Sequence, residues 1–521
     1  MSKSFRGRLL AAIFSAGAAS AFAAPAGAET LADAIALAYE TNPTLQSQRA
    51  LQRALDENYV QARSGFRPTL GLSASTSTAE TRTPRFARGT DLNNDGVPDV
   101  FPSTSGISDR DSSSLGLSFS QPIWTGGRVT AAVSAAQADI LQGRENLRRV
   151  EAQILATVIQ AYVDVRRDQE SLRIRQENVS VLGRQLQESQ ARFDVGEITR
   201  TDVAQSQARL AAAQATFSSA QAQVAISRAA YAALVGQNPQ NLAPEPSLAY
   251  LLPTDPDQAF TIAEQYSPQL RAQQFAEQAS RARVAGARAE RMPSVTVRSG
   301  LTFGASTNDP FERELYSREL SAVATVTVPL FSGGLVSSRI RQSVERNNAE
   351  RITVETTRRT VLQNITQLWS QLLASRASIG SSAEQVRAAR IAAEGTRQEQ
   401  QVGLRTTIDV LNAEQELRQA ELTQVSARRD EYVAAANVLA VMGRLEARNL
   451  TPTVPQYDAA SNARKLRITW GWVPWEEPIA IIDRVLTLAP APAPTAKPTE
   501  PAIPPGLQPP PSVATGAAVR R

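Results

Sequence analysis

The chain has 521 residues, of which 42% are hydrophobic and only 5% aromatic, and it contains neither cysteine nor histidine. The absence of these two residue types excludes disulfides, thiol nucleophiles, Ser-His-Asp triads and zinc sites with the usual ligands. Its 55 basic and 50 acidic residues give a formal net charge of +5.

Residues 1–28 are predicted to be a secretory signal peptide. Three basic residues are followed by an apolar stretch from Leu9 to Ala23, which is too short and too weakly apolar to span a membrane. We expect cleavage after Ala28, with Ala23 as the alternative site. The segment contains no acidic residue, so 52 basic and 50 acidic residues remain. This near balance gives no support to nucleic-acid binding.

Beyond the signal peptide, the sequence contains two copies of one pattern. The segment Pro-Ile-Trp-Thr-Gly-Gly at 122–127 returns as Pro-Leu-Phe-Ser-Gly-Gly at 329–334, which is 207 residues later. Gly196 and Gly403 are also 207 residues apart, and each follows a valine and precedes an Asp-Val pair. Prolines nearer the N-terminus repeat after 225 residues, which leaves 18 additional residues in the first copy. Such constant spacing indicates an internal duplication.

We assign the first repeat to residues 29–240 and the second to residues 241–450. Each is predicted to contain a first helical segment, a β-hairpin, and two long helices joined by a turn at a glycine. The predicted bounds are 31–62 and 256–291 for the first helical segments, and 66–123 and 292–330 for the hairpins.

Apolar residues alternate with small polar ones in the predicted strands. Leu115, Leu117 and Phe119 are separated by a glycine and a serine, and residues 320–328 alternate in a similar way. One apolar face and one small-polar face are typical of a strand between two media, such as lipid and water. A strand of a soluble sandwich would have the same pattern, so both interpretations remain open at this point.

Prolines and glycines mark the predicted borders between strands and helices. Proline fixes φ, removes a hydrogen-bond donor and favours an extended residue before it. Paired glycines give the backbone the freedom to turn from a sheet into a helix. The predicted junction residues are Pro68, Pro122, Gly126, Gly127, Pro293, Pro329, Gly333 and Gly334.

The interval between each junction and the following turn is long enough for an extended helix. Pro122 to Gly196 and Pro329 to Gly403 both span 74 positions, or on the order of 100 Å of helix at about 1.5 Å per residue. Apolar residues recur there every three or four positions and match between the repeats. This narrow stripe predicts antiparallel helix pairs of the coiled-coil type.

The predicted fold class is mostly α with membrane β, with four strands and long coiled-coil helices in each chain. Four strands cannot close a membrane barrel, because the smallest barrels have about eight. Open strand edges cannot face lipid either. If these strands lie in a membrane, several chains must therefore share one barrel, and their long helices would form a tube that continues it. A barrel joined to such a tube is a conduit.

These motifs resemble those of the TolC family of outer-membrane efflux and secretion channels. The resemblance covers residues 29–450 and rests on Asn42-Pro43, the two Gly-Gly junctions and the two Val-Gly…Asp-Val turns. It implies a homotrimer with a shared 12-stranded β-barrel in the outer membrane of a Gram-negative bacterium. The barrel would be continuous with a long antiparallel α-helical barrel in the periplasm. Since there is no cysteine to acylate, the chain is more similar to the non-lipidated branch of the family.

The resemblance also implies a function. The chain would be the passive exit duct of a tripartite export system, docked to a periplasmic adaptor (membrane fusion) protein and an inner-membrane ABC or RND transporter. Its cargo would be type I secretion polypeptides, small toxic molecules or both. Outer-membrane lipid is a further expected partner, and neither enzyme activity nor a nucleic acid is expected. The alternative is a trimeric coiled-coil surface stalk or adhesin without transport, which would not explain the two hairpins.

The resemblance places the two glycine turns at the periplasmic tip of the tunnel. Arg405 would help to hold the entrance shut, and Asp409 would form a ring of carboxylates that attracts cations. Gln400 and Asn412 occupy the positions of a gating tyrosine and a second aspartate ring. The implied tip residues are Gly196 and Gly403 in the turns, and Thr201, Asp202, Gln400, Arg405, Asp409 and Asn412 in the gate.

A second interpretation of Asp202 and Asp409 is local. Each begins a predicted helix, where a carboxylate can cap the helix by accepting hydrogen bonds from free amide groups. Asp409 and Asn412 are three residues apart and therefore share one helix face. A capping role and a pore role can coexist, so both are retained.

The extra length of the first hairpin contains a possible calcium loop. The sequence from 91 to 99 has the pattern D-x-N-x-D-G-x-x-D, in which oxygen ligands alternate and glycine is sixth. Pro102 occupies the place of the bidentate glutamate of an EF-hand, so a full EF-hand is excluded. The alternatives are a weak structural calcium site, the only cofactor considered, and a plain turn-rich loop. The candidate ligands are Asp91, Asn93, Asp95 and Asp99.

The C-terminal part follows the second repeat. Residues 451–487 contain Trp470, Trp472 and Trp475, and we expect this segment to pack against the outside of the helical tube. The competing interpretation is a patch at the membrane interface. Residues 488–521 are rich in proline and are predicted to form a disordered tail.

Overall fold

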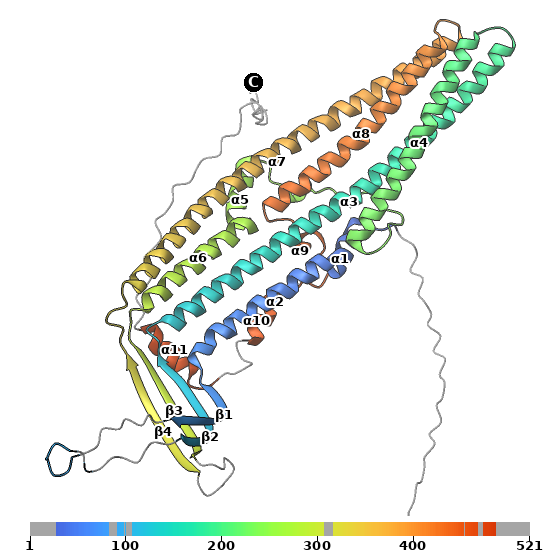
Figure 1. The fold of residues 1–521 in the computed structure, drawn as a ribbon. Coiled ribbons are helices and arrows are strands. Elements are labelled where there is room, and N and C mark those ends of the chain that lie inside the picture. The colour runs from blue at the N-terminus through green and yellow to red at the C-terminus, as the bar shows by residue number, and fades with distance from the viewer. Residues whose placement is uncertain are drawn as a thin grey trace, which may run out of the picture.

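The computed structural model describes residues 28–82, 91–97, 99, 107–306, 316–452, 454–466 and 473–485. Within these residues, the molecule is a long bundle of helices with a small sheet at one end (Figure 1). The predicted tail at 488–521 and the predicted signal peptide up to residue 27 lie outside the described residues, as do Trp470 and Trp472.

Two helices of equal length form the frame of the molecule. α3 (Arg128–Asp194) and α7 (Leu335–Gln401) each have 67 residues, or about 100 Å at about 1.5 Å per residue. Each turns back into a shorter antiparallel partner, α4 (Arg200–Val235) or α8 (Thr407–Val441). α3 and α7 begin 207 residues apart, which is the interval found in the sequence motifs.

The first helical segment of each repeat consists of two helices, not the single helix expected from the sequence. The first repeat has α1 (Leu31–Thr41) and α2 (Pro43–Arg63), and the second has α5 (Pro256–Tyr266) and α6 (Pro268–Ala289). The breaks precede Pro43 and Pro268 because a proline pushes its predecessor out of the helical conformation. Asn42 has φ −60° and ψ 120°, and its side chain caps α2.

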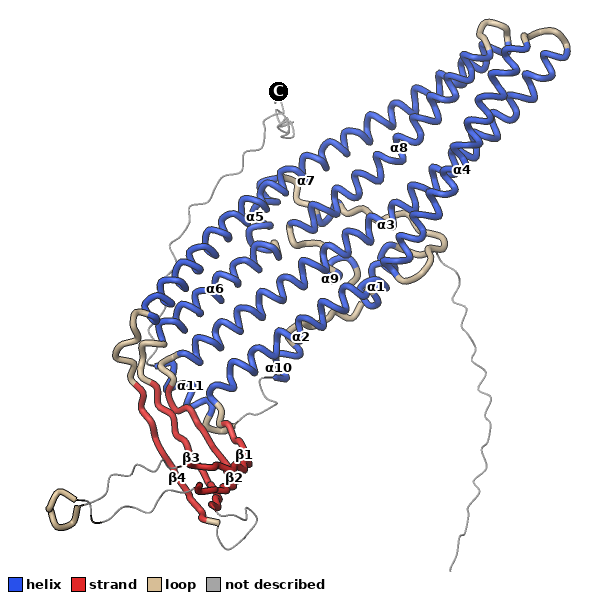
Figure 2. The backbone as a smooth tube through the Cα atoms, in the orientation of Figure 1, coloured by secondary structure: helices blue, strands red, loops and turns tan. Residues whose placement is uncertain are grey.

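The four strands form one antiparallel sheet in the order β1-β2-β3-β4. They are β1 (Thr69–Arg82), β2 (Ile107–Trp124), β3 (Ser294–Ser306) and β4 (Ser317–Thr327). β2 and β3 pair across the repeat boundary, so the two hairpins join into one sheet. Figure 2 shows this sheet as the continuation of the helical bundle at one end. A mostly helical chain with four antiparallel strands is therefore confirmed.

The largest apolar core lies in the middle part of the helical bundle, where α1, α3, α4, α5, α7 and α8 meet. Val158 and Val165 of α3 and their repeat partners Ile365 and Leu372 of α7 are each 0% exposed. The matching apolar stripe of the two repeats therefore packs between helices. Of the two short 3-10 turns described, η1 (Ser64–Phe66) lies between α2 and β1, and η2 (Ala249–Leu251) lies between α4 and α5.

Three short helices follow the second repeat: α9 (Ala447–Leu450), α10 (Ser461–Leu466) and α11 (Glu476–Val485). α10 lies against α2, where Nδ2 of Asn462 donates to Oδ2 of Asp56 at 3.1 Å. α11 contacts η1, the end of β2 and the start of α3. The described part of the C-terminal segment thus packs on the first repeat.

Candidate functional site

The two faces of the sheet differ in chemistry. Residues directly opposite one another on neighbouring strands share a face, so the strand register assigns each side chain to one side. One side, the leucine face, is apolar, and the other, the glycine-serine face, is small and polar. The leucine face contains the row Leu72, Leu117, Leu301 and Leu320, and the glycine-serine face contains the row Gly71, Ser118, Gly300 and Ser321.

The leucine face is open in the single chain. Leu72 and Leu320 are 73% and 69% exposed, although a soluble sheet would cover such a row with a second layer. Within the described residues, β1 and β4 are also edge strands, each paired on one side only. The sheet therefore has the properties of one segment of a wall between an apolar and an aqueous medium, and not of a sandwich.

The junction residues lie where the sequence places them, with one difference. Pro68 and Pro293 immediately precede β1 and β3, and Pro329 follows β4 by two residues. Pro122, however, lies inside β2, where the pairing with β3 is irregular between Pro122 and Trp124. The strand continues past this proline because the irregularity accommodates its missing amide donor.

The glycine pairs turn the chain from strand to helix. Gly126 and Gly127 have φ of +67° and +86°, and Gly333 and Gly334 have φ of +60° and +85°. These left-handed conformations favour glycine, as the sequence motif predicts. The second glycine of each pair occupies the N-cap position of α3 or α7, where it offers no side chain to the free amides.

Asp483 of α11 supplies the missing cap at the first junction. Its carboxylate accepts hydrogen bonds from the amides of Thr125 and Gly127 at 2.9 and 3.0 Å, and from the hydroxyl of Thr130 at 2.7 Å. Burial alone would raise the pKa of Asp483, but these hydrogen bonds lower it below its usual value. At the second junction, by contrast, Leu330 and Phe331 are 92% and 91% exposed.

The two tip turns have matching geometry at the end of the bundle far from the sheet (Figure 1). Gly196 and Gly403 have φ of +82° and +81°, so both turns use a left-handed glycine. After each turn a threonine, Thr199 or Thr406, is the N-cap of the returning helix. Each cap forms a capping box with the aspartate three residues later.

Asp202 and Asp409 are thus the third residues of these boxes and not the N-caps, and their carboxylates accept from the free amides of Thr199 and Thr406, as the local interpretation predicts. Oδ2 of Asp409 accepts hydrogen bonds from the hydroxyl and the amide of Thr406 at 2.7 and 3.1 Å. These bonds, together with the charge of Arg405, lower the pKa of Asp409. The carboxylate thus stays charged at pH values below its usual range.

Arg405 forms a contact within the second turn. Its Nε donates to Oε2 of Glu399 at 2.8 Å, which links the turn to the last residues of α7. Both side chains are about half exposed. The hydrogen bond to Glu399 raises the pKa of Arg405, so the guanidinium remains charged at neutral pH.

The other predicted tip residues are brought together only in part. Asn412 accepts a hydrogen bond from Nη2 of Arg209 on α4 at 3.0 Å, so it connects α8 to the neighbouring helix pair. Gln400 is buried near the end of α7, whereas Thr201 is exposed at the start of α4. The gate roles of these residues remain predictions.

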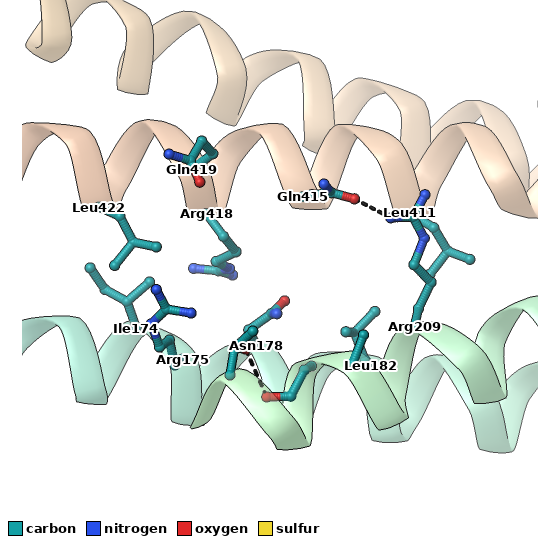
Figure 3. A pocket seen from close by; sticks show the side chains of 13 residues that line it. Ile174, Arg175, Asn178, Leu182, Arg209, Leu411, Gln415, Arg418, Gln419 and Leu422 are labelled. Atoms are coloured by element: carbon teal, nitrogen blue, oxygen red, sulfur yellow. Dashed lines mark hydrogen bonds between the residues drawn. The ribbon is translucent and has the colours of Figure 1, made fainter. Parts of the chain in front are cut away.

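A cavity of about 210 Å³ lies between the two helix pairs, below the tip. Figure 3 shows α8 on one side of it and α3 and α4 on the other, with Arg175, Arg209 and Arg418 around it. Arg209 of α4 also bonds Gln415 of α8, and Nη1 of Arg418 lies 3.8 Å from Oε2 of Glu177 on α3. Polar contacts therefore link the two helix pairs around this cavity.

In the possible calcium loop, the candidate ligand oxygens accept hydrogen bonds from backbone amides of the loop itself. Oδ1 and Oδ2 of Asp91 accept from the amides of Asn94 and Gly96, both at 2.7 Å, and Oδ2 of Asp99 accepts from the amide of Leu92 at 3.1 Å. Asn93 and Asp95 accept from amides two residues ahead, as in Asx turns. Among the described residues, no group of three or more acidic residues is placed to hold a metal ion. Calcium binding stays a prediction.

The family resemblance predicts that replacing Asp409 by asparagine weakens block of single-channel current by a divalent cation severalfold. Asparagine keeps an oxygen acceptor for Thr406 but removes the charge, so the capping box is preserved while the implied carboxylate ring is lost. The measurement is Mg²⁺ block of single-channel current in planar bilayers. Asp33→Asn, the same change in the capping box of Thr30 on α1 and away from the tip, is the matched control. Unchanged block in Asp409→Asn would contradict the pore position.

Sequence reasoning missed three residues that make contacts at these sites. They are Glu399, which pairs with Arg405, Arg209, which bonds Asn412, and Asp483, which caps α3. Glu399 could have been found, because an acidic residue six positions before a turn arginine can reach across the turn. Arg209 and Asp483 contact residues more than 200 positions away, and no local pattern indicates such pairs.

No helix in the described ranges has both the length and the apolar character needed to cross a bilayer.

Comparison with known proteins agrees with the geometry of the sheet and helices. The model of the family described as "Outer membrane efflux protein" matches residues 34–237 and 261–444. The chain is 32% identical over 444 residues to outer membrane efflux protein BepC of Brucella suis biovar 1 (strain 1330), covering 85% of this chain and 91% of BepC.

Two further comparisons are more distant. The chain is 26% identical over 304 residues to alkaline protease secretion protein AprF of Pseudomonas aeruginosa, covering 57% of this chain and 63% of AprF. Its fold is similar to that of the outer-membrane channel OprN, with a TM-score of 0.67 at 22% identity, over 79% of this chain and 89% of OprN. The matches of the family model include both tip turns and the sheet but end before α11.

Proposed function

The chain belongs to the outer membrane efflux protein family, the TolC-like channels, and from this premise we propose that it is the passive exit duct of a tripartite export system. The family consists of outer-membrane channel proteins of Gram-negative bacteria, not enzymes, with the helical part in the periplasm. The observation that carries the proposal is the two-faced sheet, which is continuous with the long helices (Figure 2). Lipid would cover the leucine face, and the glycine-serine face would line an aqueous lumen.

Comparing the two repeats supports assembly with further copies. α3 buries residues from Val129 onward, because α6 and α2 pack against its first half. In α7, the buried residues begin only at Val361. α6 packs against one side of the first half of α7. By the repeat symmetry, the side that α6 leaves open would pack against α2 of a second copy, and β4 would pair with β1 of that copy.

Barrel closure limits the number of copies. The described part of one chain provides four strands, and two copies would give only the minimum of about eight found in the smallest, filled membrane barrels. Three copies give twelve strands, which is wide enough for a lumen and agrees with the homotrimer implied by the family resemblance. We therefore propose a trimer with a shared 12-stranded barrel and a helical barrel of the same symmetry.

A passive duct has no energy source of its own and needs an energised partner. An adaptor and an inner-membrane ABC or RND transporter would meet it at the tip turns. Small toxic molecules are the favoured cargo, because the relative named for efflux is more similar and more fully covered than the relative named for protease secretion. Type I secretion polypeptides are the second candidate.

Conductance in a planar bilayer tests whether the protein is a duct. The mature full-length protein, purified in detergent and added to a planar bilayer, is expected to insert as a trimer and give discrete conductance steps. A surface stalk would give none, and a preparation that does not insert would overturn the proposal. Deleting the gene in the source cell then separates the cargoes: raised sensitivity to drugs indicates efflux, and loss of proteins from the medium indicates secretion.

A further inference from the structure

The inward side of α11 carries buried charges. Glu476 is fully buried and accepts hydrogen bonds from Nε of Arg63 at 2.6 Å and Nε of Arg67 at 3.1 Å. Asp483 is also fully buried, in its cap on α3. Ile479 lies with Phe66 and Val129 in a small apolar cluster. These contacts fix the helix against the first junction in one orientation.

The outward side of α11 is apolar. At 3.6 residues per turn, Ile481 and Val485 project on the side opposite Glu476, Ile479 and Asp483. Ile482 lies at the border of the two sides, and Trp475 directly precedes the helix. Trp475, Ile481, Ile482 and Val485 are 45%, 55%, 46% and 74% exposed. Glu477 and Arg484 lie along the other border of this apolar side. A segment that buries Glu476 and Asp483 and exposes four large apolar residues has the reverse of the pattern expected for a helix that faces water.

Trp475 connects α11 to the leucine face of the sheet. Its Nε1 donates to Oε1 of Gln121 at 3.2 Å. Gln121 alternates in β2 with Phe119 and Leu117 and is paired with Val297, so it belongs to the leucine face. α11 therefore lies on that side of the sheet, at the end where the strands meet the helices (Figures 1 and 2).

We propose that α11 is an interfacial anchor whose outward side enters the periplasmic leaflet of the outer membrane. The lipid that covers the leucine face would continue over Trp475, Ile481, Ile482 and Val485, because these side chains extend the same apolar surface. With ten residues, the helix lies along the interface and does not span the membrane. The inference rests on the proposed function, which places the sheet in lipid.

The absence of cysteine from the chain gives a direct test, since one introduced cysteine provides a single labelling position. Nitroxide spin labels would be attached to the full-length variants Ile481→Cys and Val485→Cys in phosphatidylethanolamine–phosphatidylglycerol vesicles. Leu72→Cys on the leucine face is the lipid reference, and Val195→Cys, which is exposed at the tip, is the water reference. The measurement is how accessible each spin label is to oxygen, which partitions into lipid, and to a water-soluble nickel chelate. The ratio of the first accessibility to the second is compared between labels.

The labels on α11 are expected to give a ratio severalfold above that at Val195 and approaching that at Leu72. A ratio equal to that at Val195 would overturn the anchor. So would low accessibility to both reagents, because it would mean that protein, such as a second copy, covers this side. If the Leu72 label itself behaves as in water, the proposed function fails and the anchor fails with it. A lipid signal at Leu72 without one on α11 refutes the anchor alone.

Discussion

Channels with serine in place of Arg405 are expected to show a resting conductance severalfold above that of the unchanged protein. The guanidinium of Arg405 is the group that ties the second tip turn back to Glu399 at the end of α7. Serine is too short to reach that carboxylate, so the turn between α7 and α8 loses its internal ionic contact. The entrance would then spend more time open. The measurement is single-channel conductance in planar bilayers without partner proteins.

Two further variants define what Arg405 does. Arg387→Ser breaks an exposed pair with Glu384 on α7, away from the tip, and is expected to leave the conductance unchanged. Glu399→Gln removes the partner but keeps the arginine. An increase in both Arg405→Ser and Glu399→Gln would assign the effect to this pair, whereas an increase in Arg405→Ser alone would indicate a contact to another copy. No increase in Arg405→Ser would contradict its gate role.

Gly443→Ala is expected to destabilise the protein strongly, whereas the same change at the repeat-related Gly236 has a smaller effect. Both glycines have positive φ, +71° and +93°, where an L-residue costs about 1–2 kcal/mol. At Gly443, however, a Cβ would lie 2.3 Å from the carbonyl oxygen of Tyr266. At Gly236, the nearest atom would be the hydroxyl of Thr41 at 3.4 Å.

The difference arises because the backbone oxygen of Tyr266 cannot rotate away as the hydroxyl of Thr41 can, and Tyr266 is followed directly by the buried Ser267. Met442 and Leu445, on either side of Gly443, are both 0% exposed in the main core. Overpacking such a core costs about 1–3 kcal/mol beyond the strained φ. Thermal unfolding followed by circular dichroism in detergent measures both variants. Equal midpoints for Gly443→Ala and Gly236→Ala would show that the clash at Tyr266 is relieved without cost.

The architecture could be predicted because proline and glycine determine which backbone conformations are accessible at their own positions. The repeated Gly-Gly pairs located both strand-to-helix junctions, and Gly196 and Gly403 located both tip turns, since each needs a left-handed conformation. The break before Pro43 was missed although its signal was present, because the apolar pattern continues through it. Most borders between helices, strands and turns could therefore be predicted from local sequence motifs.

The contacts of the candidate site were less accessible to sequence reasoning. The aspartates of the tip turns were expected at the helix starts, but the choice of Thr406 over Asp409 as the cap depends on where the helix begins. The cap from Asp483 to Gly127 joins residues 356 positions apart. Such a pair is determined by how α11 docks on the fold, and no spacing within the sequence encodes it.

The cap provided by Asp483 makes the two repeats unequal. α3 begins under α11, where Asp483 caps it, whereas α7 begins at Leu335 close to Leu330 and Phe331, which are exposed in the single chain. In a ring of three copies, the six corners between wall and tube would alternate between two kinds. Three would be fastened by a carboxylate of their own chain, and the other three would face the adjoining copy, so assembly would complete only the second kind.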